Sequence, residues 1–103
     1  MTMTAKPKST KLQLQHEISD MVSEVSSIAI DSRGALYNHC DKLSDQSKRR
    51  VCILANMSGK LQMLEEYIDD IGVYIVHSQV EKIFKEAQLI YTRLNEEVNA
   101  IAQ

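Results

Sequence analysis

Residues 36–71, LYNHCDKLSDQSKRRVCILANMSGKLQMLEEYIDDI, decide the fold of this chain. Alternate steps of four and three residues from Leu36 reach eleven positions, of which nine are apolar and two, Ser47 and Arg50, are polar. Because an α-helix completes a turn in 3.6 residues, this spacing keeps one apolar stripe on one helix face and predicts a helix. The eleven positions are Leu36, Cys40, Leu43, Ser47, Arg50, Leu54, Met57, Leu61, Leu64, Ile68 and Ile71.

The length of this segment raises the question of what covers its stripe. As one helix it would be roughly 54 Å long, whereas a compact domain of about 100 residues is only about 35 Å across. Either a partner helix lies along it, or the helix breaks and the chain folds back on itself. The sequence favours one helix over 35–71, with a break near Ser44 as the alternative, because Ser-Asp-Gln-Ser at 44–47 offers helix N-caps.

Two further helices are predicted on either side of this segment. Thr10, with Gln13 three residues later, predicts a helix start, and Gly34 predicts a stop, which gives a helix over 10–31. After Gly72 a new stripe, interrupted only by Glu97, predicts a helix over 73–102. The expected fold is therefore all-α, with three long amphipathic helices, possibly four, in a hairpin or bundle with coiled-coil-like packing.

The composition fits a small globular protein. The chain has 103 residues, 44% of them hydrophobic and 25% charged, with one proline and three glycines, too few turn residues for an all-β domain. Residues 1–9 are expected to be a flexible tail, and residues 10–103 a single helical domain. No apolar run is long enough for a signal peptide or a transmembrane helix, which predicts a cytoplasmic protein.

Charge and cysteine content limit the classes of function that the chain can have. The net charge is −2 and the isoelectric point about 5.9, without the basic excess of a non-specific nucleic-acid binder. Lys48, Arg49 and Arg50 form the densest positive cluster, so a nucleic-acid-binding regulator is kept as an alternative. The two cysteines, Cys40 and Cys52, lie in predicted helix and are expected to be free, buried thiols.

Two pairs of carboxylates suggest a second alternative. Glu17 with Asp20, and Glu66 with Asp69, each place two acids one helical turn apart. This spacing resembles the helical nucleotide pyrophosphohydrolases of the MazG type, in which two such pairs hold Mg²⁺ against a nucleoside triphosphate. The resemblance implies a metal-dependent nucleotide hydrolase. Such pairs are also usual on any exposed helix face, and the preferred expectation is a protein that is not an enzyme and has no catalytic residue, cofactor or metal site.

The preferred function is a protein–protein interaction module whose apolar stripes pack against helices of other proteins. The architecture resembles small helical subunits of adaptor complexes and secretion chaperones, so the chain is expected to self-associate or to be a subunit, adaptor or chaperone of a larger helical assembly. Flanking charges such as Glu65, Lys82, Glu86 and Arg93 would provide specificity. The expected partner-interface residues are Leu54, Met57, Leu61, Leu64, Ile68, Val76, Val80, Ile83, Phe84, Ile90, Tyr91 and Leu94.

Overall fold

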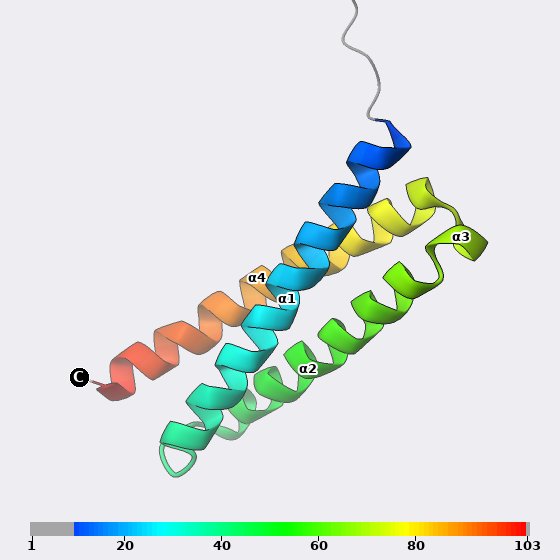
Figure 1. The fold of residues 1–103 in the computed structure, drawn as a ribbon. Helices are drawn as coiled ribbons and strands as arrows, with labels where there is room; N and C mark the ends of the chain where they lie inside the picture. Colours follow the sequence, from blue (N-terminus) through cyan, green and yellow to red (C-terminus); the bar gives the residue numbers. More distant parts are fainter. Residues whose placement is uncertain (1–9, 103) are drawn as a thin grey trace, which may run out of the picture.

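Three long helices pack side by side in an elongated bundle (Figure 1). The computed structural model describes residues 10–102, and the expected tail over residues 1–9 lies outside them. Within 10–102 there is no strand, which confirms the all-α prediction. The molecule extends 62 × 29 × 16 Å. Its helices are α1 (Lys11–His39), α2 (Asp45–Glu66), the four-residue α3 (Ile68–Ile71) and α4 (Val73–Ala102).

α1 begins where the sequence predicts and ends eight residues later than predicted. The Thr10 side chain accepts a hydrogen bond from the Gln13 backbone N–H at 3.0 Å and so caps the helix. The predicted stop at Gly34 is wrong, because α1 continues through it to His39. A glycine inside a helix costs only about 1 kcal/mol relative to alanine. Buried Ser32 before Gly34 and Leu36 packed against the core after it hold both sides in place.

The predicted unbroken helix over 35–71 is also wrong, and the alternative break near Ser44 is the one that occurs. The chain turns at 40–44, where the His39 carbonyl accepts the backbone N–H groups of Lys42 and Leu43. Ser44 is the N-cap of α2, and its hydroxyl accepts from the Ser47 N–H at 3.1 Å. The chain therefore folds back on itself here.

A second turn reverses the chain between α2 and α4. The predicted hinge Gly72 has φ +106°, a conformation that glycine adopts at far lower cost than residues with a Cβ. α2 itself ends at Glu66, and the four residues of α3 precede the hinge. α4 then covers Val73–Ala102, which matches the predicted last helix.

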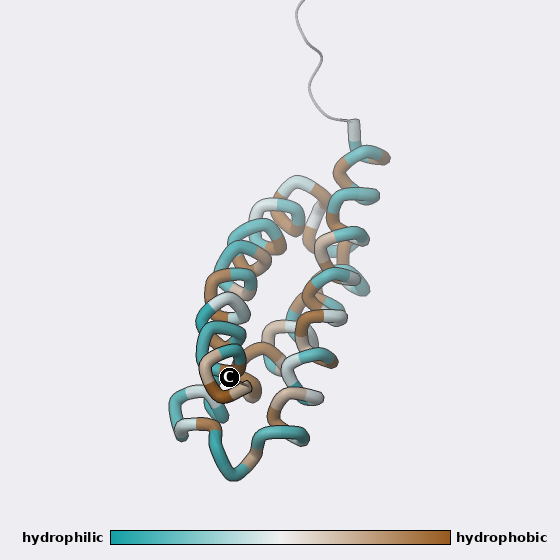
Figure 2. The backbone as a smooth tube through the Cα atoms, turned by 90° about the vertical axis from the view of Figure 1, so that its left-hand side faces the viewer, coloured by the Kyte–Doolittle hydropathy of each residue, from teal (hydrophilic) through white to brown (hydrophobic). Residues whose placement is uncertain are grey.

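The core lies between the three long helices. Figure 2 shows hydrophobic and hydrophilic segments alternating along each of them. Most of the predicted apolar stripe of residues 36–71 is covered by the chain itself. The chain folds back at Ser44, so the two halves of the stripe lie in different helices. The buried apolar side chains are Leu14, Ile18, Val22, Val25, Ile28, Ala29, Leu43, Val51, Leu54, Leu61, Leu64, Val73, Val76, Val80, Ala87 and Leu94.

α1 and α4 run parallel, in a register set by polar pairs. The Oε1 atom of Glu17 lies 2.7 Å from Nε2 of His77, and the Tyr91 hydroxyl donates to the Asp31 carboxylate. Both pairs are 60 residues apart in the sequence, so the two helices keep one constant offset over four turns. Between them, the Gln88 amide donates to Glu24 at 3.2 Å. This line of hydrogen bonds flanks the α1–α4 contact.

Candidate interaction surface

The α2–α4 contact is the least extensive of the three contacts between long helices, and an open pocket lies between these two helices. We call the surface between α2 and α4, from this pocket to the Arg50–Glu97 pair, the groove. At one end Arg50 of α2 lies 3.9 Å from Glu97 of α4. At the other end Lys60 of α2 and Glu86 of α4 line the same open pocket of about 290 Å³, together with Gln79, Lys82 and Ile83. The two helices are antiparallel, so these two points fix their register.

The floor of the groove is apolar and incompletely covered. Met57 lies seven residues after Arg50 on α2, and Ile90 lies seven residues before Glu97 on α4. Because the helices are antiparallel and Arg50 lies beside Glu97, half-buried Met57 and Ile90 are at opposing positions. Ile53 is 42% exposed one turn before Met57. Half-buried Ile83 continues the floor into the 290 Å³ pocket. We call Ile53, Met57, Ile83 and Ile90 the groove floor.

The rim of the groove carries more positive than negative charge. Exposed Lys60 and Lys82 line the pocket together with the carboxylate Glu86, and exposed Arg93 lies seven residues beyond Glu86 on α4. Lys60 is three residues from Met57, and Arg93 three from Ile90, so each lies about one turn from a floor residue. Within residues 10–102 none of these three cations forms an ion pair. The rim, which we define as Lys60, Lys82, Glu86 and Arg93, therefore has a net charge of +2 on a chain whose net charge is −2.

A polar network closes the far end of the groove. The Glu97 carboxylate accepts hydrogen bonds from the Ser44 backbone N–H at 2.6 Å, the Ser44 hydroxyl at 2.8 Å and the Ser47 hydroxyl at 2.6 Å. Arg50 donates to the buried Ser47 hydroxyl at 2.9 Å. The Glu97 carboxylate of α4 thereby places a negative charge at the N-terminus of α2, where a negative charge stabilises the helix.

These contacts change the acidity of Glu97. Donation by the Ser47 hydroxyl, and then by the backbone N–H and hydroxyl of Ser44, stabilises the ionised carboxylate and lowers the pKa of Glu97, and Arg50 adds a smaller effect of the same sign. In the α1–α4 contact the hydrogen bond to Asp31 raises the pKa of Tyr91, because it favours the protonated hydroxyl. The α2–α4 contact is therefore expected to weaken in acid, and the α1–α4 contact to weaken in alkali.

The expected partner-interface residues divide into three groups. Leu54, Leu61, Leu64, Val76, Val80 and Leu94 are buried within the chain itself. The others are half-buried, and among them Tyr91 bonds to α1, with Phe84 seven residues before it on the same side, while Ile68 lies in α3. The remaining three, Met57, Ile83 and Ile90, belong to the groove floor together with Ile53, which lies off the predicted stripe of residues 36–71. Among the expected specificity charges, Lys82, Glu86 and Arg93 lie on the rim, and Glu65 does not.

The positive cluster does not form one surface. Consecutive helical residues point about 100° apart, so Lys48, Arg49 and Arg50 fan out around α2. Arg50 is held by Ser47 and Glu97 at the groove end. The stripe of aligned cations that would follow a phosphate backbone is not formed by these three side chains.

The carboxylate pairs and the thiols also differ from their expected settings. Glu17 pairs with His77, and α2 ends at Glu66, so Asp69 lies on a separate helix. Within residues 10–102 no three His, Cys, Asp or Glu side chains are grouped to hold a metal ion. Both cysteines are free, but the prediction that they are buried is wrong, because Cys40 lies in the α1–α2 turn and Cys52 on the outer side of α2.

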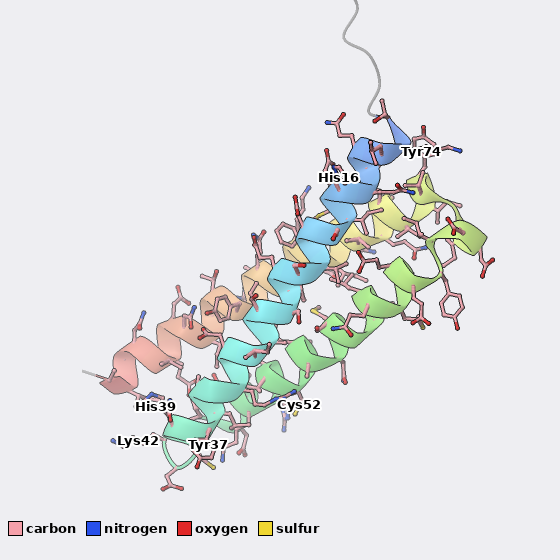
Figure 3. All side chains as sticks on the ribbon, viewed as in Figure 1. His16, Tyr37, His39, Lys42, Cys52 and Tyr74 are labelled. Carbon is pink, nitrogen blue, oxygen red and sulfur yellow. The ribbon has the colours of Figure 1, made fainter. Side chains whose placement is uncertain are left out.

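The remaining polar and aromatic groups are dispersed. Figure 3 places His16 and Tyr74 at one end of the molecule and Tyr37, His39 and Lys42 at the other. A second exposed apolar group surrounds the Gly72 turn, where it accompanies Asp69 and Asp70. Its members are Tyr67, Ile71, Tyr74 and Ile75. Of the helices in the described part of the chain, none combines the length and apolar character of a membrane span.

Comparison of the chain with protein-family models, curated proteins and solved structures finds no match in any of the three. The function of the groove is therefore inferred from its own geometry and charge.

Proposed function

We propose that this protein is a non-enzymatic interaction module that binds a helix of another polypeptide in the α2–α4 groove. The observation that carries the proposal is the groove floor, which lies along one side of two antiparallel helices. Ile53 is exposed, Met57, Ile83 and Ile90 are only partly buried against the core, and within residues 10–102 no third helix covers them. A helix laid between α2 and α4 would complete a four-helix arrangement, in which each helix buries its apolar stripe against two neighbours.

The size of the groove suits a short helical segment. On the α4 side the pocket is lined from Gln79 to Glu86, and the Arg50–Glu97 pair lies eleven residues beyond Glu86, so the surface from Gln79 to Glu97 corresponds to about 27 Å of helix. A partner helix of about 18 residues would have this length and would present five or six residues to the floor. Burying a fully exposed large aliphatic side chain contributes roughly 1.5–3 kcal/mol. Each floor residue is already partly buried, so covering it would contribute a fraction of this value, and apolar side chains of the partner helix would add to it.

The two alternatives receive less support. A nucleic-acid-binding regulator would use Lys48, Arg49 and Arg50, which point in different directions around α2. A nucleotide hydrolase would need its two carboxylate pairs together, and Glu17 is engaged by His77 on α4. The subunit or adaptor role and the cytoplasmic location remain predictions.

Site-specific photo-crosslinking tests the proposal. Three full-length chains would carry the photoreactive residue p-benzoylphenylalanine in place of Ile53, Met57 or Leu12, and be irradiated in the cell. Leu12 is 62% exposed on α1, which does not form the groove, and this makes it the control. We expect adducts from positions 53 and 57 to map to one helical segment of the same polypeptide, and position 12 to give none. Equal labelling at all three positions, or adducts at position 12 alone, would contradict the proposal.

A further inference from the structure

We propose that the helix bound in the α2–α4 groove is acidic, with an apolar stripe flanked by Glu or Asp side chains. This inference rests on the proposed function and specifies its partner. The observation behind it is that Lys60 and Lys82 line the pocket beside Ile83, that Arg93 lies about one helical turn from Ile90, and that none of these three cations has a carboxylate partner within residues 10–102.

The charge distribution of the rest of the molecule makes this rim distinctive. The acids of α1 are partly engaged, since Glu17, Glu24 and Asp31 accept hydrogen bonds from α4. At the groove end Arg50 and Glu97 lie together, so neither presents an unopposed charge. Lys60, Lys82 and Arg93 thus have long side chains beside an apolar surface, where their stems can cover a partner's aliphatic groups while their charges meet its carboxylates.

The same charges disfavour pairing of the groove with the groove of a second copy. In a two-fold symmetric contact each residue meets the equivalent surface of its partner, so two rims of charge +2 would be brought together. Glu86 can oppose only one of the cations on each side. Like charges placed together across an interface suppress association, which leaves an acidic helix of a different polypeptide as the occupant with complementary charge.

The test uses two synthetic 18-residue amphipathic helices with the same leucine stripe, one flanked by Glu and one by Lys. Their binding to the full-length chain would be measured by fluorescence anisotropy at low and high salt. We expect the Glu-flanked peptide to bind at least about tenfold more tightly, with a preference that shrinks as salt screens the rim. Equal binding, or tighter binding of the Lys-flanked peptide, would overturn the inference.

A pair of variants with equal changes in net charge localises the effect. Lys82→Glu reverses a rim charge, whereas Lys85→Glu makes the same change on the exposed surface of α4 outside the pocket. We expect Lys82→Glu to weaken binding of the Glu-flanked peptide by about three- to tenfold, and Lys85→Glu by less than about twofold. Equal losses in the two variants would show general attraction and overturn the inference.

Ile53→Ser separates this inference from the function on which it rests. If both peptides bind equally and Ile53→Ser weakens both, the groove binds helices without preference for acid, and only the inference fails. If neither peptide binds but light scattering shows an oligomer that Ile53→Ser dissociates, a second copy occupies the groove, and again only the inference fails. If neither peptide binds and the chain is a monomer with or without the substitution, both proposals fail.

Discussion

α4 contacts its two long neighbours in different ways. Along α1 it runs parallel, and the line of contact is flanked by hydrogen bonds from His77, Gln88 and Tyr91 to three acids spaced seven residues apart. Along α2 it runs antiparallel, its polar contacts gather at one end around Glu97, and the groove floor beside them is half-exposed.

The difference separates a contact that fixes the packing of two helices from a contact that leaves apolar surface open. A contact with polar partners along its length fixes register, because each pair is satisfied only at one offset. An open contact with one polar end holds two helices together while leaving apolar surface for a third. We expect substitutions in the two regions to have separable effects on stability and on binding.

The largest expected effect comes from the shared core beneath both contacts. Leu94 is fully buried, so Leu94→Ala should lower the free energy of unfolding by about 2–5 kcal/mol through lost burial and a cavity. Ile53→Ala removes a side chain that is 42% exposed and should cost less than about 1 kcal/mol. Urea denaturation followed by circular dichroism measures both. Similar losses would mean that the groove floor is as well covered as the core.

The polar end of the α2–α4 contact should respond to acid. Glu97→Gln weakens the cap of α2 and should lower the free energy of unfolding by about 1–2 kcal/mol at neutral pH. Because the pKa of Glu97 is lowered on folding, its contribution is present above its ordinary value of 4.5 and is lost as the pH falls below that value. The decline in stability on acidification should therefore be shallower in the variant. Identical pH profiles would show that Glu97 is not held as described.

The α1–α4 contact should respond to alkali instead. Tyr91→Phe removes the hydrogen bond to Asp31 and should cost about 0.5–1.5 kcal/mol at neutral pH. Since the pKa of Tyr91 is raised on folding, this contribution is present below its ordinary value of 10.0 and is lost as the pH rises above it. Thermal unfolding at pH 8 and pH 11 should show the difference between wild type and variant shrinking at the higher pH. A constant difference would count against the raised pKa.

The smallest expected effect tests the continuity of α1. Gly34→Ala should raise the free energy of unfolding by about 0.5–1 kcal/mol, because Gly34 is helical and a Cβ there would meet no neighbouring atom. Gly59→Ala in α2 is the matched control, with the same open surroundings and the same expected gain. A loss at position 34 beside a gain at position 59 would indicate that the helix ends near Gly34 after all.

The polar exceptions to the apolar stripes were the most informative residues in the sequence. Ser47 and Arg50 interrupt the stripe of residues 36–71, and Glu97 interrupts the stripe of the last helix. Each of these three residues made the predicted apolar stripe of its helix less regular. In the structure all three meet in one network at the end of the groove. Spacing shows that a position departs from its stripe, but it does not show that two departures 50 residues apart are partners.

The sequence by itself determined the helical class, the start of α1, the hinge at Gly72 and the extent of α4, because these depend on local periodicity, caps and backbone conformation. Only the tertiary structure decided that α1 continues through Gly34, that the chain breaks at Ser44, and which apolar residues are core and which form the groove floor. The physical reason is that a periodic stripe identifies the apolar face of a helix, whereas the neighbour that covers this face is chosen by packing between segments far apart in the chain.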